Sequence, residues 1–587
     1  MRYLFCFLLL GAISATAQQQ PVSPAQLEQQ AEARQTEINR SQAPRGFTPG
    51  ERSSSTPSPH SDTAAQTRCL PIQRVVLDGE GAARFSRYLK QALSQQALQP
   101  RKMGEVQYSI NRVDKTACLS AADIERLSEA VQNAVIDAGL VTNRIVVTDQ
   151  DLNSGNLQLT ILPGYAGDKI LTADSAGKRT PNLRSTIPVR RGELLNLRDI
   201  EQGLENLRRL PTVEAGIDIV PGGQMGQSDL QVRWQQQRWW RFNFAVDDSG
   251  SKATGKYLGT LGLSLDNPLR LSDTLALNYS RNLLPGKKQR SQSGHSGRGR
   301  SDNYAANYSM PLGYWTLELG ANRYYYDQAV AGQTLTYHYQ GTSTQEQANL
   351  SRILYRNARH KVEASVGVWQ KTNKSYVDDA EITVQRRRQG GWQAGITHTA
   401  YLGTGNLQSS LNYKKGTGAF SSLPAPEAAW GEGTSRFAIW TGDVNWQQPF
   451  TLGQHTFIWN TRLHGQWTDD RLTPVDRLSI GGRYNVRGYN GEITLSGDKG
   501  AYLRNDLQWR YRGQHGVYLA LDGGHVSGPS TARLPGKTLL GGALGLKGRW
   551  DARGAWHYDF FIGTPLHHPD AMHPDNFVTG FSIHYNY

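Results

Sequence analysis

From residue 237 to the C-terminus, the sequence is a succession of short segments in which apolar and polar residues alternate. We count sixteen of them, beginning with RWWRFNFAVD and ending with FVTGFSIHYNY. Alternation places successive side chains on opposite faces of a strand, so that one face is apolar. Segments of about ten alternating residues are typical of strands that cross the outer membrane. We therefore predict an all-β membrane barrel of sixteen antiparallel strands over residues 237–587.

The connections between these segments alternate in length. Short turns such as DNPLR, RNARH and LGTG follow one set of strands, and long polar loops follow the other set. In outer-membrane barrels the short turns face the periplasm and the long loops face outward. A soluble β-sandwich or propeller is the alternative, although no blade-length repeat is evident. The expected outer loops include residues 283–302, 417–435, 468–500 and 564–575.

The N-terminal residues indicate export from the cytoplasm. Residues 1–17 combine Arg2, an apolar stretch and an Ala-Thr-Ala ending, which predicts a secretory signal peptide. This segment contains one of the three cysteines, so Cys69 and Cys118 remain in the mature chain. In an oxidising compartment we expect these two to form a disulfide, with two buried free thiols as the alternative.

Charge and motifs limit the classes of partner. The formal net charge of +14 is consistent with anionic lipid head groups. The basic clusters at 286–290 and 385–389 lack interleaved aromatic residues, so we expect no nucleic-acid binding. His567, His568 and His573 lie in a Pro-rich stretch without a His-Glu-x-x-His helix, which favours a surface loop over a metal site. We expect no cofactor, no metal and no enzymatic activity.

Residues 23–40 are predicted to form a helix that cannot bury an apolar stripe. Ser23 is a suitable cap and Pro24 suits the first helical position. Leu27 and Ile38 are the only large aliphatic residues, so the helix is either solvated or lies in a water-filled space. Residues 41–66 are rich in Pro, Ser, Thr and Gly, which indicates a flexible linker.

Two small α+β modules are expected between this linker and the barrel. The first covers residues 67–165, with helices at 83–95 and 121–140. The second covers residues 166–236, with a helix at 197–210 followed by two strands. Helical periodicity and alternating strands support both modules, and their size is within the normal range for domains.

The loop segment GGRYNVRGYNGE, residues 481–492, is unusually specific for a glycine-rich stretch. By the strand count it joins the eleventh and twelfth strands on the outer side. Alternation directs Asp506 and Asp522 of the next two strands into the lumen. We hypothesise that the loop folds back into the pore and that Arg487 pairs with Asp522, and also with Asp506, through its planar guanidinium. A solvated loop arginine is the alternative.

Several of these segments resemble a known family. VRGY (486–489) matches the loop motif of the two-partner secretion transporters, the TpsB family of the POTRA-barrel superfamily, and LDGG (521–524) looks like its second barrel motif. Both α+β modules resemble the POTRA domains of this family. The resemblance implies that residues 18–40 form a plug helix and that the 468–500 loop lies in the lumen. It also implies a lumen-loop lock, made by Val486, Arg487, Gly488, Tyr489, Asp506, Asp522 and Gly524.

The resemblance further implies what the chain does. Such a protein is a monomer of the bacterial outer membrane with its POTRA domains in the periplasm, in contact with lipid and lipopolysaccharide. It exports one large exoprotein, a toxin or adhesin with β-helical repeats, to the cell surface. The paired cysteines are most similar to the contact-dependent-inhibition and haemolysin-transporter branch, and we favour a contact-dependent inhibition toxin as cargo. A haemolysin or adhesin transporter, a barrel-assembly factor and a passive porin are the alternatives.

Overall fold

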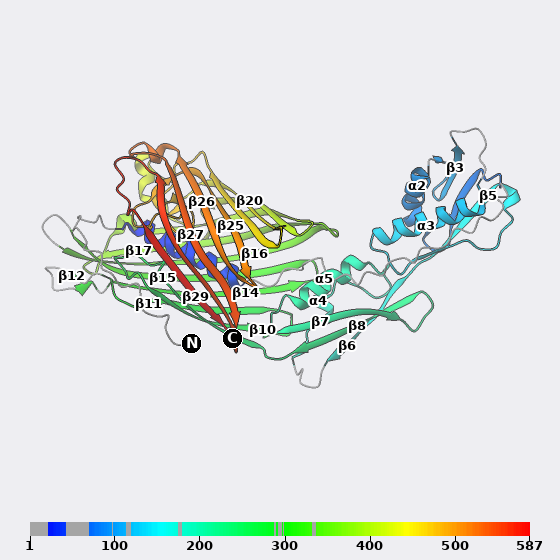
Figure 1. Cartoon of the computed structure of the whole chain (residues 1–587), viewed down its shortest axis with the longest axis horizontal. Helices are drawn as coiled ribbons and strands as arrows, with labels where there is room; N and C mark the ends of the chain where they lie inside the picture. Colours follow the sequence, from blue (N-terminus) through cyan, green and yellow to red (C-terminus); the bar gives the residue numbers. More distant parts are fainter. Residues whose placement is uncertain are drawn as a thin grey trace.

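The computed structural model describes residues 22–42, 70–96, 98–112, 119–173, 179–286, 289–290, 296–297, 299–331 and 336–587. A β-barrel forms one end of the molecule, and two smaller α+β units extend from its rim (Figure 1). The predicted signal peptide (1–17), nearly all of the predicted linker and both Cys69 and Cys118 lie outside the described residues. In the described ranges, no helix combines the length and the apolar character needed to cross a membrane.

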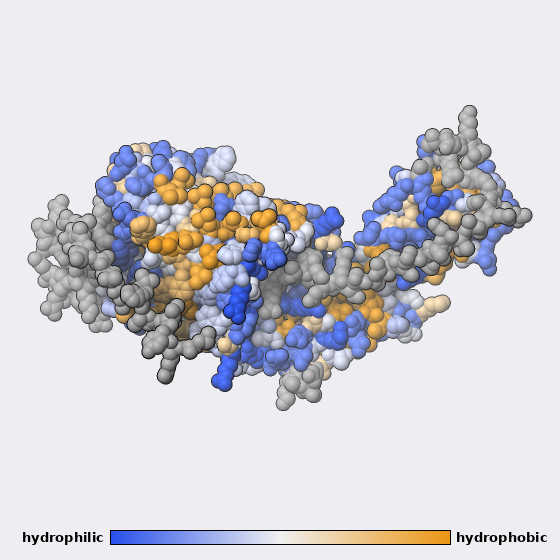
Figure 2. Space-filling model, viewed as in Figure 1, coloured by the Kyte–Doolittle hydropathy of each residue, from blue (hydrophilic) through white to orange (hydrophobic). Residues whose placement is uncertain are grey.

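The barrel consists of sixteen long antiparallel strands, which confirms the predicted fold class. The first strand, β9, pairs with both β10 and the last strand, β29, and this closes the cylinder. An apolar band crosses the outer wall (Figure 2). The strands are β9 (Trp240–Asp247), β10 (Leu258–Asp266), β11 (Thr274–Asn282), β14 (Arg300–Leu312), β15 (Trp315–Ala331), β16 (Thr336–Arg356), β17 (His360–Val377), β19 (Arg387–Leu402), β20 (Gly405–Thr417), β21 (Ala438–Leu452), β22 (His455–Trp467), β25 (Lys499–Arg512), β26 (His515–Ser527), β27 (Thr538–Asp551), β28 (Ala555–His567) and β29 (Val578–Asn586).

Short strands also form within the long outer loops of the barrel. Two small hairpins, β12–β13 (Gln289–Arg290 and Ser296–Gly297) and β23–β24 (Leu478–Ile480 and Leu495–Gly497), belong to the long outer loops. Several main strands are longer than the alternating pattern predicts. β15 and β16 stay paired as far as Ala331 and Thr336, because polar residues extend the backbone ladder beyond the apolar wall.

The first α+β unit is a five-stranded sheet in the order β2-β3-β1-β5-β4 with two helices packed against it. Its strands are β1 (Arg74–Asp78), β2 (Leu98–Lys102), β3 (Gln107–Arg112), β4 (Arg144–Val146) and β5 (Asn156–Leu162), and its helices are α2 (Ser86–Gln95) and α3 (Ala121–Asp137). Helix α3 begins with a capping box, in which the Asp123 amide donates to Ser120 and the Ser120 amide donates to Asp123. Strands β2 and β3 were not predicted. Strand β2 does not alternate, whereas the short alternation of Tyr108 and Ile110 in β3, both buried, was missed.

The second α+β unit is smaller and is attached to the barrel. Its sheet has the order β6-β8-β7, formed by β6 (Tyr165–Ala173), β7 (Val213–Pro221) and β8 (Gln227–Gln236), with the helices α4 (Leu183–Thr186) and α5 (Leu197–Arg208). Trp234 is among its buried residues. Strand β6 was not predicted, because Asp168 and Lys169 interrupt its apolar pattern.

Helix α5 fixes this second unit to the periplasmic turns of the barrel. The Glu205 carboxylate pairs with Lys361 Nζ at 3.0 Å and also with Arg356, both at the turn between β16 and β17. Asn206 Nδ2 donates to the Gly313 carbonyl at 2.8 Å. Burial opposes the charge of Glu205, but Lys361 and Arg356 outweigh it and hold the pKa of Glu205 below its ordinary value. The second unit is therefore held by buried polar contacts.

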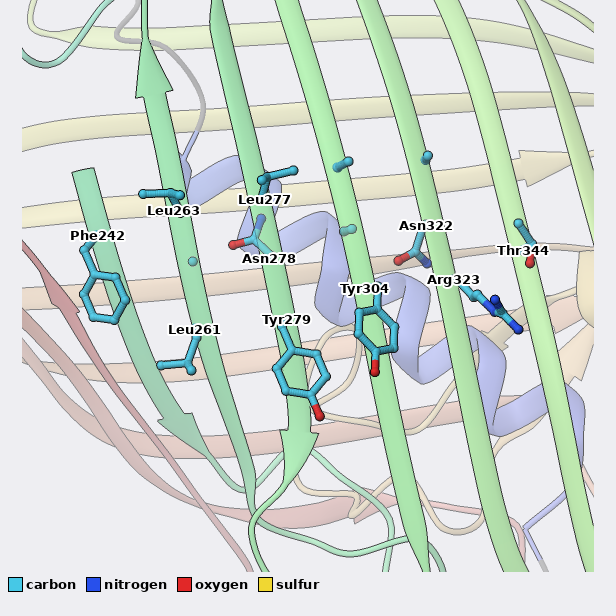
Figure 3. Close-up of a pocket in the computed structure, with 14 residues that line it drawn as sticks. Phe242, Leu261, Leu263, Leu277, Asn278, Tyr279, Tyr304, Asn322, Arg323 and Thr344 are labelled. Atoms are coloured by element: carbon cyan, nitrogen blue, oxygen red, sulfur yellow. The ribbon is translucent and has the colours of Figure 1, made fainter. Parts of the chain in front are cut away.

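Helix α1 (Pro24–Gln42) lies inside the barrel, behind the wall strands (Figures 1 and 3). Leu27 is buried against a cluster of inward tyrosines, Tyr324, Tyr326 and Tyr339. Otherwise the helix contacts the wall through polar side chains, as expected for a helix in a hydrophilic lumen.

Candidate functional site: a loop and a helix inside the barrel

The 481–492 loop folds into the lumen and is braced by its own asparagine. The Asn485 side chain accepts hydrogen bonds from the amides of Gly481 and Gly482, both at 2.9 Å, and donates to the Ser479 carbonyl at 2.9 Å. Such side chain-to-backbone bonds fix a tight turn. Gly488 has a φ of 101°, a left-handed conformation that favours glycine.

Arg487 binds the carboxylate of Asp522 on β26 in a bidentate manner. Its Nε lies 2.6 Å from Oδ2 and its Nη2 lies 2.7 Å from Oδ1. The Arg487 amide also donates to Oδ2 at 3.0 Å, so one carboxylate holds both the side chain and the backbone of the loop. Arg487 is 3% exposed and Asp522 is 1% exposed. The pair is buried, bidentate and charge-assisted, and such hydrogen bonds are stronger than those between neutral groups.

Asp506 on β25 adds a second negative charge beside the same guanidinium. Its Oδ1 lies 2.5 Å from Arg487 Nη2, although the orientation does not make it a hydrogen-bond acceptor. Lys547 Nζ lies 3.6 Å from its other oxygen. Asp506 thus acts on Arg487 through charge, while Asp522 acts through charge and hydrogen bonds.

Alternation along β26 explains why these carboxylates face inward. Tyr518 and Asp522 are almost fully buried, whereas Leu519 and Leu521 are 63% and 58% exposed on the outer wall. A register shifted by one residue would direct Asp522 into lipid, which is costly for a charge. The strand pattern therefore positions the acceptor of the Arg487 loop.

The other contacts between this loop and the wall are apolar and closely packed. Val486 and Tyr489 belong to a buried cluster with Ile480, Leu495, Val526, Leu539 and Met572. Tyr489 Oη donates to the His567 carbonyl at 2.7 Å. A Cβ at Gly541 would lie only 1.8 Å from the Arg487 carbonyl, and one at Gly524 would lie 3.1 Å from Val486. Glycines on the wall are thus needed for the loop to approach it.

Helix α1 is fixed to the barrel wall by two groups of buried ionic contacts. Arg34 donates from Nη2 to Asp247 at 2.8 Å and to Thr260 at 2.6 Å. On another part of the wall, the Glu28 carboxylate lies 2.9 Å from Lys371 Nζ. It also accepts hydrogen bonds from Ser343 and Asn373, both at 2.6 Å.

The helix also contacts the loop itself. Gln30 Nε2 donates to the Gly491 carbonyl at 2.7 Å, and Gln26 Nε2 donates to Thr494 Oγ1 at 2.7 Å. Between the helix, the loop and the wall there remains a polar cavity of about 840 Å³. Helix and loop together fill part of a lumen that would otherwise be a wide channel.

Sequence reasoning did not find the partners of α1. Arg34 and Asp247 are far apart in the sequence, and neither lies in a motif. Asp247 could have been noted as an inward position at the end of the first barrel segment, and Lys371 as a cation at an inward position of β17. Nothing in the sequence connects either of them to residues 23–40.

This architecture defines a class of protein: an outer-membrane β-barrel with two periplasmic α+β modules and a lumen occupied by its own chain. The model of the family described as "Haemolysin secretion/activation protein ShlB/FhaC/HecB" matches residues 226–548, more than half of the chain. Two POTRA models match residues 108–164 and 168–221. The chain belongs to the ShlB/FhaC family of two-partner secretion transporters, whose members are not enzymes.

Individual relatives agree with this assignment. The outer membrane transporter CdiB-2 of Burkholderia pseudomallei is 32% identical over 475 residues, which cover 79% of this chain and 78% of that protein. The haemolysin transporter HpmB of Proteus mirabilis is 29% identical, with 68% of each chain covered. The solved structure of CdiB from Acinetobacter baumannii, at 27% identity, covers 97% of this chain and 100% of its own with a TM-score of 0.77. The predicted family, fold and outer-membrane location are confirmed.

Proposed function

We propose that the exoprotein exported by this transporter is a contact-dependent inhibition toxin. The supporting observation is the extent of the similarity to CdiB proteins: 79% of this chain aligns with CdiB-2 of Burkholderia pseudomallei, against 68% with the haemolysin transporter HpmB. The exoprotein is a large chain with β-helical repeats, and its folding outside the cell, coil upon coil, provides the driving force for export.

Helix α1 acts as a plug in this proposal. Its contacts with the wall are ionic and polar, so water can solvate the separated groups when the helix leaves. Residues 18–40 form the plug, and residues 41–66 form the tether that keeps a released plug close to the barrel. Residues 1–17 direct the chain to the periplasm and are then removed.

The lumen-loop lock holds the 468–500 loop against the wall in this proposal. Support comes from the burial of Arg487 and from its three hydrogen bonds to Asp522. A loop held at this position keeps the lumen in a defined shape for the emerging chain. Val486, Gly488, Tyr489 and Gly524 supply the packing, and Asp506 supplies additional charge.

The POTRA modules receive the unfolded exoprotein in the periplasm. Among the described strands, β2 and β4 end the first sheet and β6 and β7 end the second, so each sheet has edges where an extended peptide can add as a further strand. Such capture depends mainly on backbone hydrogen bonds, which suits a long and repetitive substrate.

The choice of cargo is testable by exchange. The chain is produced in cells without other transporters of this type, together with either the exoprotein partner of the B. pseudomallei transporter or that of HpmB. Surface display is read as protease accessibility in whole cells. We expect display of the former exoprotein and little of the latter. Display of the haemolysin alone would reassign the chain to haemolysin export, a second candidate that the similarity to HpmB supports.

A further inference from the structure

The outer wall of the barrel carries an apolar hollow between β10 and β16 (Figure 3). Its floor is formed by Ala306 of β14 and Ala321 of β15, which are direct cross-strand neighbours. Leu277 of β11 stands in the same row, opposite Ala306. The other side chains of this cross-strand row are large, so the two small alanines leave a depression in the wall. The hollow has a volume of about 530 Å³.

The hollow continues along the wall. A neighbouring hollow of about 370 Å³ shares Ala306 and Ala321 and extends past Leu319 to Val368 of β17. Together the two form an elongated, mainly apolar trough on the lipid-facing side, with Glu346 in the lining of the second hollow. Its shape fits a flexible hydrocarbon chain better than a compact ligand.

An aromatic and cationic row borders the trough toward the outer end of the barrel. Tyr279, Tyr304 and Arg323 are successive cross-strand partners in this row. The rings of Tyr279 and Tyr304 lie 4.9 Å apart, and Arg323 is exposed. Thr212 of the second POTRA unit contacts Asp266 at the opposite end of β10. That end is therefore periplasmic, and the row of Tyr279, Tyr304 and Arg323 lies on the outer side of the trough.

Further arginines lie just beyond this row. Arg281 Nε lies 3.7 Å from Asp302, and Arg300 pairs with the same carboxylate. Asp302 also accepts a hydrogen bond from Tyr279 Oη at 2.8 Å. Arg281 and Arg300 thus share one carboxylate, and Asp327 is the cross-strand partner of Arg300. The wall beyond the trough therefore carries charges of both signs, and Arg323 stands in the row nearest the trough.

Arg323 requires an explanation because it forms no ion pair within the described residues. An arginine on the lipid-facing side of a barrel costs about 2–4 kcal/mol at the membrane midplane and less near the interface. Long cationic side chains reduce this cost by reaching toward the head groups. A phosphate in the outer leaflet would supply the missing counter-charge.

We propose that this trough binds one molecule of lipopolysaccharide through its lipid A, the phosphorylated glycolipid of the outer leaflet. One acyl chain lies along Ala306 and Ala321, and a phosphate contacts Arg323 with Arg281 and Arg300 nearby. Glu346, the cross-strand partner of Ala321, lines the second hollow on the periplasmic side of Arg323, and its carboxylate disfavours a phosphate there. The bound orientation is therefore with head group outward. The proposal rests on the outer-membrane location and not on the identity of the cargo.

Native mass spectrometry of the full-length protein, purified from outer membranes in a mild detergent, tests this proposal. Purified lipid A, dephosphorylated lipid A and phosphatidylglycerol are the added probes. Arg323→Gln removes the cation, and the double variant Ala306→Leu/Ala321→Leu fills the trough without changing the charge. We expect lipid A occupancy to fall about fivefold or more in each, the effect of losing a charged contact or the chain's binding space.

Arg388→Gln is the matched control, since Arg388 is an exposed outer-end arginine of β19 that does not line either hollow. It should retain lipid A like the unmodified protein. Heat-modifiable mobility in gel electrophoresis shows that every variant is folded. Equal loss in Arg388→Gln, no loss in either trough variant, or equal binding of dephosphorylated lipid A or phosphatidylglycerol would overturn the proposal. Exoprotein secretion is measured separately, so failure of the cargo assignment remains distinguishable.

Discussion

Two contacts hold Arg487 at this buried position. Its guanidinium fork is matched by the two oxygens of Asp522, and its own backbone amide is bound by the same carboxylate. A lysine would provide one point charge and could not reproduce this fork. The identity of the residue, and not only its charge, therefore determines the position of the loop.

Removing either partner is expected to impair export. Removing one side of a buried ion pair costs about 3–5 kcal/mol, because the other charge is left without compensation. Arg487→Ala and Asp522→Ala should each reduce exoprotein secretion about tenfold or more while the barrel still folds and inserts. Secretion is measured by immunoblot of the medium and insertion by heat-modifiable mobility.

Two further variants sharpen this prediction. Arg487→Lys should remain impaired, since the fork is lost although the charge is kept. Arg549→Ala serves as the control, because the ion pair of Arg549 within the described part of the chain is with the exposed Asp551 two residues away. Wild-type secretion by both Arg487→Ala and Asp522→Ala would contradict the role of the pair.

For individual residues, the sequence predicted the Arg487 site better than it predicted the contacts of helix α1 with the wall. Alternation alone directed Asp506 and Asp522 inward, and the VRGY motif singled out Arg487. By contrast, Glu28 binds Lys371 and Arg34 binds Asp247 through a fold that brings the N-terminal helix into the lumen. No periodicity encodes such a pairing, because the helix and the wall are separate elements without a shared register.

Among the elements, helix α1 lies in the lumen and contacts the wall through buried ionic and polar side chains. Its length was predicted from capping and composition, although the helix extends to Gln42, two residues past the predicted end. Alternation also located all sixteen wall strands, since each has one lipid-facing side. It placed their outer ends less well, because those ends leave the membrane and lose the apolar face that makes the pattern visible.

Deleting residues 22–42 should increase the ion conductance of the barrel. The polar cavity beside α1 would merge with the space that the helix occupies, so we expect conductance in planar bilayers to rise several-fold, as in an unobstructed barrel. Substituting Gln29→Ala, which removes two contacts to loop carbonyls but leaves the helix in place, is the control. Unchanged conductance after deletion would argue against a plug.

Helix α5 gives a pH dependence to the junction between the second POTRA unit and the barrel. The pKa of Glu205 is lowered in the docked state by Lys361 and Arg356, against the effect of burial. Its contribution to docking is therefore present above the ordinary pKa of 4.5 and is lost as the pH falls through the lowered value.

Glu205→Gln should consequently loosen the second unit at neutral pH and remove most of its acid dependence. Hydrogen exchange of the α5 amides is the measurement, with faster exchange expected in the variant at pH 7. Glu214→Gln, at an exposed position of β7, is the control and should behave like the unmodified protein. If both variants exchange equally slowly, Glu205 does not hold the junction.

For the whole molecule, one chain forms both the channel and its obstruction. Sixteen strands enclose a lumen, while α1 and the Arg487 loop occupy it from two sides and contact each other through Gln26 and Gln30. The order of the described parts along the chain was predictable from composition: a polar helix, two α+β modules and an alternating barrel. Their placement in space was not, because it depends on polar contacts between distant segments.

The central claim is that α1 must leave the lumen before an exoprotein can pass. A short, reducible bis-maleimide cross-link between Asn39→Cys on α1 and Asn307→Cys on β14 tests it, since the tips of these side chains lie 3.1 Å apart. The pair is introduced with Cys69 and Cys118 changed to Ser, and each single cysteine is a control. The account predicts that secretion stops in the cross-linked variant and returns when the linker is reduced. Wild-type secretion by a fully cross-linked protein would contradict it.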